Sequence, residues 1–172
     1  IREFESMLQS IKLQGEYNGK KFTYPGPSHL AIGEEATAVG TIMALGENDY
    51  VFGTHRGHNQ GLTKGLDVNE MMAEILARKD GCCGGVGGSM HIADPTKRYF
   101  GADGVLGASA VMANGVALAI KKQGIEDEIV NLFFGDINRF VKLKVPFAQT
   151  GTLIGQTAFG TEELFMDARE NV

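Results

Sequence analysis

The sequence is poor in the residues that build disulfides and metal sites. It has only two cysteines, Cys82 and Cys83, and their adjacency fits neither a disulfide framework nor the spaced ligand pairs of a zinc site. We therefore expect free thiols that are buried or half buried. Two of the four histidines, His55 and His58, bracket Arg56, but no third ligand at a matching spacing supports zinc there.

Long apolar runs and clustered positive charge are also absent. No run approaches the ~20 residues of a membrane-spanning helix, and the first five residues (IREFE) lack the basic-then-apolar order of a secretory signal. The net charge is −5 and the basic residues are scattered, which argues against a nucleic-acid partner. We expect a cytoplasmic protein that binds neither membrane nor nucleic acid.

The common nucleotide and hydrolase motifs are missing too. There is no GxxxxGK[ST] loop, no GxGxxG after a predicted strand and no GxSxG elbow. Glycine, by contrast, is abundant: eight of the 24 glycines fall between Gly81 and Gly107. Because glycine lets the backbone approach a ligand closely, this stretch predicts a ligand cradle rather than a linker.

Apolar spacing predicts a chain of helices followed by strands. A composition of 43% hydrophobic and 22% charged residues suits one globular domain of 172 residues. The expected helices are 1–14 ending near Gly15, 33–45, one capped by Asp67 with Met71, Met72, Ile75 and Leu76 facing inward, and 108–121, rich in small residues. The expected strands are Ile129–Phe134 and, more weakly, 153–158, before a terminal helix from Thr161.

Three features together suggest a diphosphate bound through a divalent cation: the glycine-rich stretch, Arg56 and Asp136. Arg56 precedes Gly57, and a guanidinium binds phosphate in a bidentate manner. Asp136 follows an expected strand, where α/β sheets bind ligands, and magnesium is held by one or two carboxylates together with phosphate. An ordinary turn aspartate remains an equal alternative for Asp136 taken alone.

Five short segments, in matching order and spacing, carry a resemblance to a known family. They are residues 29–36 (HLAIGEEA), 54–58 (THRGH), 87–91 (GGSMH), 104–108 (GVLGA) and 134–136 (FGD). Together they resemble the alpha subunits of thiamine-diphosphate-dependent pyruvate, branched-chain 2-oxoacid and acetoin dehydrogenase components. The resemblance implies an α/β thiamine-diphosphate-binding fold, with a mostly parallel sheet flanked by helices, forming a single domain over 1–172.

The same resemblance implies thiamine diphosphate and Mg²⁺ as cofactors and assigns residues to them. Arg56 would contact the diphosphate, beside His55, which stands where some members have tyrosine. Backbone groups of Gly104 and Leu106 would meet the aminopyrimidine, and Leu106 could at the same time be a core residue. Gly135 and Asp136 belong to the cofactor motif, with Asp136 the magnesium ligand. His29 and His91 are the candidate catalytic residues, the alternative being histidines that shape loops.

The implied activity is oxidative decarboxylation of a small 2-oxoacid such as pyruvate, or cleavage of acetoin. The implied partners are a beta subunit, in an alpha2beta2 assembly, and the dihydrolipoyl acyltransferase core of the complex. A degenerate, non-catalytic assembly or binding subunit is the alternative function.

The resemblance breaks after residue 136. The family motif begins Gly-Asp-Gly and ends in paired asparagines, whereas this chain continues Ile137-Asn138 and never reaches an Asn-Asn pair. Either the chain lacks the second half of the magnesium site, or residues after Asp136 are pieces of a longer protein whose intervening loops are missing from the sequence. We favour the second, because functional loops are the most mobile parts of such proteins. The domain is therefore expected to be incomplete after 136.

Overall fold

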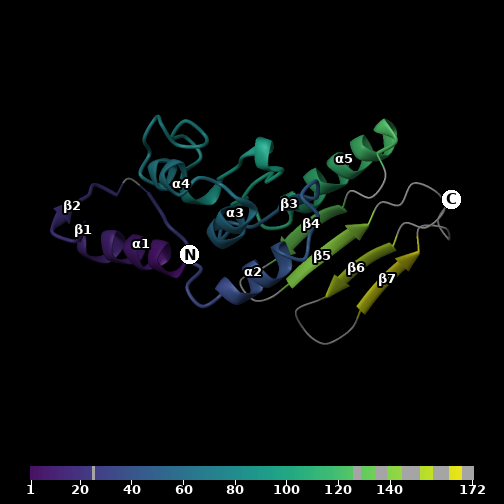
Figure 1. Cartoon of the computed structure of the whole chain (residues 1–172), viewed down its shortest axis with the longest axis horizontal. Helices are drawn as coiled ribbons and strands as arrows, with labels where there is room; N and C mark the ends of the chain where they lie inside the picture. Colours follow the sequence, from purple (N-terminus) through teal and green to yellow (C-terminus); the bar gives the residue numbers. More distant parts are fainter. Residues whose placement is uncertain (25, 126–128, 135–138, 145–151, 157–162, 168–172) are drawn as a thin grey trace.

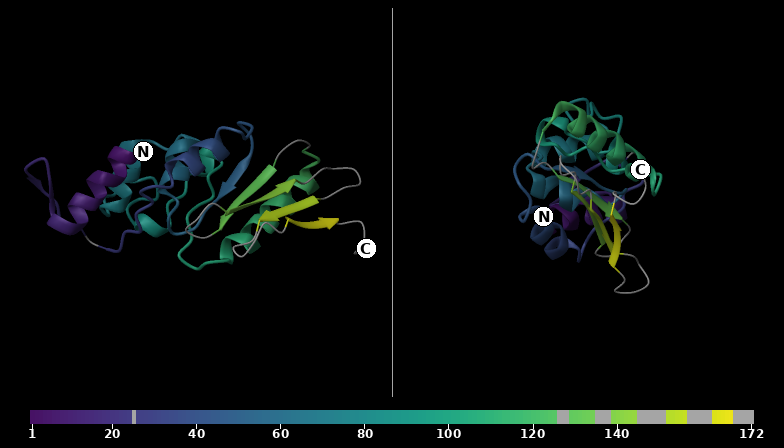
Figure 2. Two further views of the ribbon diagram at one scale, coloured as in Figure 1. Left: turned by 90° about the horizontal axis from the view of Figure 1, so that it is seen from below. Right: turned by 90° about the vertical axis from the view of Figure 1, so that its right-hand side faces the viewer.

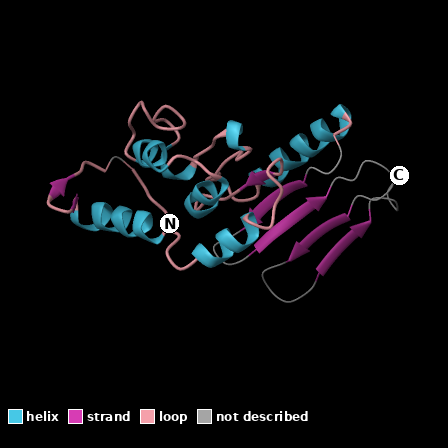
Figure 3. Ribbon diagram, viewed as in Figure 1, coloured by secondary structure: helices cyan, strands magenta, loops and turns pink. Residues whose placement is uncertain are grey.

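The computed structural model describes residues 1–24, 26–125, 129–134, 139–144, 152–156 and 163–167. Helices and loops make up the amino-terminal part of the molecule, and the five strands of the larger sheet gather at the opposite end (Figure 1, Figure 3). The chain thus combines helices and a sheet, as expected of an α/β protein.

The first helix, α1 (Arg2–Gln14), confirms the expectation from apolar spacing. Phe4, Leu8 and Ile11 are buried along its inner face. The helix ends at Gly15, whose φ of 72° is left-handed and whose amide donates to the Ile11 carbonyl. Burial of this apolar stripe fixes α1 against the rest of the fold.

A short hairpin that the sequence analysis did not predict follows α1. Strands β1 (Glu16–Tyr17) and β2 (Lys20–Lys21) pair antiparallel across Asn18 and Gly19. Both turn residues have positive φ, 49° and 73°, which is the requirement of the type I′ turn that Asn-Gly favours.

The middle of the chain alternates short helices with loops. The elements are α2 (Glu35–Ile42), β3 (Tyr50–Phe52), α3 (His58–Lys64), α4 (Val68–Ile75) and the single-turn helices η1 (Gly88–Met90) and η2 (Pro95–Lys97). The helix expected over 33–45 is confirmed, although its regular part is shorter. Side chains from α1, α2, β3 and α4 form the main core around the fully buried Tyr99.

The capped start of α4 is confirmed. Asp67 Oδ1 accepts the Asn69 and Glu70 amides at 2.8 and 3.0 Å. Of the four side chains expected to face inward, Met71 and Ile75 are fully buried, while Met72 and Leu76 are half buried.

The larger sheet has the order β3-β4-β5-β6-β7, adding β4 (Ile129–Phe134), β5 (Arg139–Lys144), β6 (Thr152–Gln156) and β7 (Glu163–Asp167). Only β3 and β4 are parallel, with Phe52 opposite Leu132. The other three pairings are antiparallel. The expectation of a mostly parallel sheet is therefore wrong for the described strands. Consecutive parallel strands need a crossover of a dozen or more residues, and the links between β4, β5, β6 and β7 are all shorter.

Of the two elements expected near the carboxy terminus, the strand is confirmed and the helix is wrong. The weak strand expected over 153–158 is confirmed as β6. The terminal helix expected from Thr161 is wrong, because Glu163–Asp167 pairs with β6 as strand β7, Thr152 lying opposite Asp167. Pairing with a neighbouring strand overrides the modest helix preference of this glutamate- and leucine-containing segment.

The longest helix, α5 (Ala108–Gln123), lies along one face of the sheet (Figure 2). Ala113 and Ile120 are buried against Phe52 of β3. The helix confirms the expectation over 108–121 and ends at Gly124, which has a φ of 67°. Among the described residues, no helix has both the length and the apolar character needed to cross a membrane.

Candidate functional site

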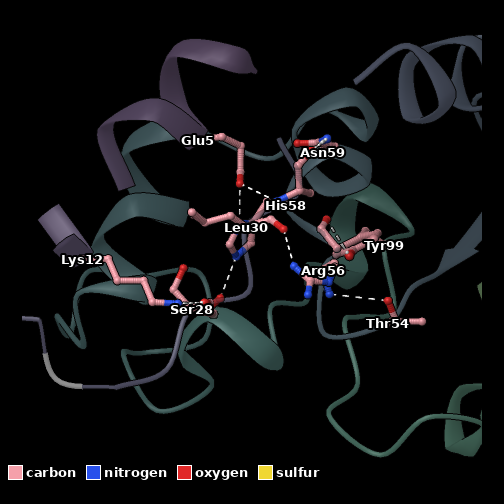
Figure 4. A network of polar contacts seen from close by, with 12 residues as sticks. Glu5, Lys12, Ser28, Leu30, Thr54, Arg56, His58, Asn59 and Tyr99 are labelled. Atoms are coloured by element: carbon pink, nitrogen blue, oxygen red, sulfur yellow. Dashed lines mark hydrogen bonds and ion pairs between the residues drawn. The ribbon is translucent and has the colours of Figure 1, made fainter. Parts of the chain in front are cut away.

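Three of the predicted site residues lie together just beyond β3. The chain leaves Phe52, turns through residues 53–56 and enters α3 at His58. In this turn the Arg56 guanidinium donates to the Leu30 carbonyl, and the Arg56 amide lies 3.5 Å from Thr54 Oγ1 (Figure 4). The His29 and His55 rings meet edge to face, with centroids 4.5 Å apart. The structure therefore joins His29, His55 and Arg56 in one cluster.

Four side chains hold the backbone on either side of His29. Their bonds are Lys12 Nζ to Ser28 O at 2.6 Å, Arg56 to Leu30 O, Ala31 N to Glu5 Oε2 at 2.7 Å and Asn59 Nδ2 to Ala31 O at 2.9 Å (Figure 4). An irregular segment has no neighbouring strand or helical turn to satisfy its backbone, so side chains take that role. The placement of His29 is thus set by α1 and α3.

Gly57 shapes the turn that carries Arg56. A Cβ at Gly57 would lie 2.1 Å from the Tyr99 hydroxyl, which itself donates to the Gly57 carbonyl at 3.0 Å. Tyr99 is fully buried, and that burial raises its pKa well above the ordinary range, so it remains a neutral donor. Any larger residue at position 57 would clash with the Tyr99 hydroxyl and displace this turn.

His91 and Gly104 form a second pairing of predicted residues. A Cβ built on Gly104 would lie 3.3 Å from both Cε1 and Nε2 of His91, so the ring rests against the bare glycine backbone. Leu106, two residues further on, is 62% exposed, so it is not a core residue of the described part of the chain. The exposed 104–107 loop leads into α5, whose first residue follows Gly107 without a side-chain cap.

The glycine-rich loop after α4 is organised by a carboxylate of the protein itself. Glu74 is fully buried, and its two oxygens accept four backbone N–H groups of the loop. Those donors are Cys83 at 2.7 Å, Gly85 at 2.8 Å, Gly87 at 2.8 Å and Gly88 at 3.0 Å. Burial raises the pKa of Glu74, but these donors outweigh burial and hold the pKa below its ordinary value. These four amides are therefore not a cradle for an external ligand.

The two cysteines lie beside this carboxylate. Ligand atoms of Glu74, Cys82 and Cys83 are within 4.8 Å of one another. Each Glu74 oxygen, however, already accepts two N–H bonds, and Cys83 Sγ sits between the amide and carbonyl of Ala93, 3.3 Å from each. Burial, with a smaller contribution from Cys83, raises the pKa of Cys82 to about 12. Both cysteines are half-buried free thiols, as predicted, and the cluster is structural.

Arg56 follows β3, and the predicted site residues Gly135 and Asp136 follow β4 in the sequence. Because the two strands are parallel, both end at the same edge. Arg56 lies in the turn that follows β3. Gly135 and Asp136, which come next after β4 in the sequence, lie outside the described residues.

The structural roles of Glu5, Asn59 and Glu74 were not predicted from the sequence. A signal for Glu5 was present: it shares the inner face of α1 with Phe4 and Leu8, and a charge within an apolar stripe needs a buried partner. Glu74 gives a similar signal, since it shares the buried face of α4 with Met71 and Ile75, whereas no such signal marks Asn59.

Comparison with known proteins decides the family. A family model described as "Dehydrogenase E1 component" matches residues 6–137, more than half of the chain. The chain belongs to the dehydrogenase E1 component family.

The relatives of this E1 chain are alpha subunits. It is 44% identical over 136 residues to the alpha subunit of acetoin:2,6-dichlorophenolindophenol oxidoreductase of Cupriavidus necator, covering 79% of this chain and 38% of the relative. The corresponding Bacillus subtilis subunit is 43% identical over the same lengths. The somatic mitochondrial pyruvate dehydrogenase E1 alpha subunit of Homo sapiens is 34% identical over 137 residues, 78% of this chain and 34% of the relative. This E1 chain thus spans little more than a third of the relatives it matches.

Proposed function

We propose that the chain is the cofactor-binding part of a thiamine-diphosphate-dependent E1 alpha subunit, which acts with a beta subunit on a small 2-oxoacid or on acetoin. The observation that carries the proposal is the parallel pair β3 and β4. The turn with Arg56 follows one strand, and the sequence places Asp136 two residues after the other. A cation after one of these parallel strands and a carboxylate two residues after the other would suit a diphosphate bridged to Mg²⁺.

The described residues fit this cofactor. A guanidinium has five N–H donors, so Arg56 can bind phosphate oxygens while still donating to Leu30 O. The exposed loop with Gly104 and Leu106 offers backbone groups to the aminopyrimidine, and His91 rests beside it. When bound, thiamine diphosphate supplies the attacking carbon and the ring that accepts the electrons left by loss of carbon dioxide.

In the proposed mechanism the chain orients the cofactor. Arg56, beside His55, would hold the diphosphate, and Asp136 would bind Mg²⁺ next to Gly135 in the sequence. His29 and His91 would be the candidate proton donors or acceptors. The beta subunit completes the site, and the assembled alpha2beta2 component delivers its product to the acyltransferase core.

The direct test is thiamine diphosphate titration by calorimetry, with Mg²⁺ present, on the chain assembled with its beta subunit. Arg56→Ala should weaken binding about tenfold to a hundredfold, the effect of losing roughly 1.5–3 kcal/mol of charge-assisted hydrogen bonding. The exposed Arg78→Ala is the matched control and should bind as the unmodified protein does. Unchanged affinity in Arg56→Ala would assign Arg56 a purely structural role.

The metal assignment is tested by Asp136→Asn, which keeps the size and one oxygen but removes the charge. It should raise the Mg²⁺ concentration needed for half-maximal cofactor binding. The melting temperature of the cofactor-free protein should stay the same. An unchanged Mg²⁺ requirement would identify Asp136 as a turn residue.

A second function is favoured by the missing Asn-Asn pair. Without it, the chain would be a degenerate assembly or binding subunit with an incomplete magnesium site. Association with the beta subunit without any Mg²⁺-dependent thiamine diphosphate binding would support this alternative.

A further inference from the structure

Three buried polar side chains connect the three segments of the proposed cofactor site. Glu5 comes from α1, His58 from the start of α3 and Ser89 from η1, and their exposed fractions are 0%, 0% and 3%. Glu5 Oε1 lies 2.7 Å from His58 Nδ1, and His58 Nε2 lies 2.8 Å from Ser89 Oγ. Figure 4 shows Glu5 reaching both His58 and the segment beside Leu30.

Each contact falls two residues from a proposed site residue. Glu5 Oε2 accepts the amide of Ala31, two residues after His29, at 2.7 Å. His58 is two residues after Arg56, and Ser89 is two residues before His91. One continuous hydrogen-bonded chain therefore fixes the relative positions of all three segments.

The bonding pattern also assigns the proton on His58. Glu5 receives the Ala31 N–H on one oxygen and offers the other as an acceptor, so His58 Nδ1 carries the hydrogen that faces it. Nε2 of a neutral ring is then the acceptor for the Ser89 hydroxyl. In this arrangement each of the three contacts joins one donor to one acceptor.

The order serine, histidine, carboxylate matches that of a hydrolase triad, but its placement here does not suit hydrolysis. Ser89 is almost fully buried, so an acyl substrate has no access to its oxygen. Glu5 instead accepts the backbone amide of Ala31, and His58 links Glu5 to the Ser89 side chain.

We propose that Glu5, His58 and Ser89 are positioning residues that form a buried relay. In this relay Glu5 fixes the His58 tautomer, and the three side chains hold the segments of His29, Arg56 and His91 in the relative positions that the cofactor needs. The inference rests on the proposed function. It assigns a task to α1, which contributes no residue to the proposed site itself. None of the three residues needs to touch cofactor or substrate.

Glu5→Gln tests the relay with almost no change of volume. The glutamine oxygen still accepts from Ala31, but its NH₂ group must face His58 Nδ1, which moves the ring hydrogen to Nε2. Ser89 then loses its acceptor. Ser89→Ala breaks the last bond while leaving Glu5 and the tautomer in place. Glu3→Gln, an exposed position on the same helix, is the matched control.

The measurements are ¹⁵N spectra of the His58 ring, the melting temperature, thiamine diphosphate affinity, and kcat and KM of the chain assembled with its beta subunit. Glu5→Gln should shift the hydrogen from Nδ1 to Nε2, whereas Ser89→Ala and Glu3→Gln should not. Glu5→Gln and Ser89→Ala should both lower kcat on the order of tenfold to a hundredfold, the cost of misplaced active-site groups, with a much smaller change in KM. Glu3→Gln should match the unmodified protein.

Several results would overturn the relay. They are an unchanged tautomer in Glu5→Gln, normal kcat in both relay variants, or labelling of Ser89 by a fluorophosphonate, which would make it a nucleophile. Failure of the unmodified assembly to bind thiamine diphosphate would instead overturn the proposed function and the task given to the relay there. The ring spectra would still decide whether the proton arrangement exists.

Discussion

At the scale of single residues, Glu74 shows how a buried carboxylate can take the place of a ligand. Its oxygens satisfy four amides of the loop that follows α4. Among the described residues no cation pairs with Glu74, and its full burial is tolerated because several N–H dipoles converge on it. The glycines are needed in turn: a Cβ at Gly81 or Gly85 would lie about 2.4–2.5 Å from atoms of Glu74 or Arg78.

Glu74→Gln is expected to lower the free energy of unfolding by about 2–4 kcal/mol. The amide keeps one acceptor oxygen but turns an NH₂ group toward two backbone donors, and buried donors without partners cost about 1–3 kcal/mol each. Urea denaturation followed by circular dichroism measures the loss. Glu70→Gln, exposed on the same helix, serves as the control. A change below about 0.5 kcal/mol would mean that the loop does not depend on this carboxylate.

The same carboxylate should make stability depend on pH. Its folded-state pKa lies below the ordinary value of 4.5, so its contribution is fully present above about 4.5 and is lost as the pH falls through the lower, folded-state value. The pKa of Glu35, which Arg2 lowers to about 2, adds loss in the same range. Subtracting the pH profile of Glu74→Gln from that of the unmodified protein isolates Glu74. Parallel profiles below pH 4.5 would contradict this account.

At the scale of elements, the Asp67 cap of α4 is expected to contribute measurably to stability. Asp67→Ala removes the acceptor for two first-turn amides and should cost about 1 kcal/mol, within the range of roughly 0.5–2 kcal/mol for such caps. Asp67→Asn, which retains the acceptor oxygen, should cost much less. Equal losses in the two variants, measured by urea denaturation, would mean that the charge and not the cap stabilises the helix.

Element length separates what the sequence predicted from what it did not. α1 and α5 have several turns of apolar spacing and a glycine at their ends, and both were predicted nearly to the residue. β3 has three residues and α3 has seven with a central glycine, too few for any period to emerge. Strand direction in the sheet was taken from the family resemblance, whereas the short links between β4 and β7 determine it.

The candidate site, too, was predicted only in part from the sequence. The grouping of Arg56 with His29 and His55 follows from sequence segments whose order and spacing match a family. The relay of Glu5, His58 and Ser89 joins residues 31 to 53 positions apart, and only the contacts of α3 with α1 and with η1 reveal it. Long-range polar contacts leave no periodic signal in a single sequence.

At the scale of the whole molecule, α5 presents an apolar face that the described part of the chain leaves uncovered. Val111 and Leu118, two turns apart on one side of the helix, are 74% and 54% exposed. Between them, a Cβ on Gly115 would meet nothing within 4 Å. Val105 and Leu106 continue the exposed surface at 68% and 62%. Apolar surface of this extent is usually covered by a partner, and the proposed alpha2beta2 assembly provides one.

Leu118→Asp should therefore weaken assembly with the beta subunit without unfolding the chain. A charge buried in an interface costs more than the ~1.4 kcal/mol that corresponds to a tenfold loss of affinity, whereas an aspartate on a free helix surface changes stability little. Leu13→Asp is the matched control: the same substitution, at a leucine 73% exposed on α1. Light scattering of the mixed subunits should find a heterotetramer for the unmodified chain and for Leu13→Asp, and mostly separate subunits for Leu118→Asp at the same concentration. Melting temperatures of the three isolated alpha chains should agree within a few degrees. Full assembly of Leu118→Asp, or an unmodified chain that stays monomeric beside its partner, would show that this face of α5 is not the assembly surface.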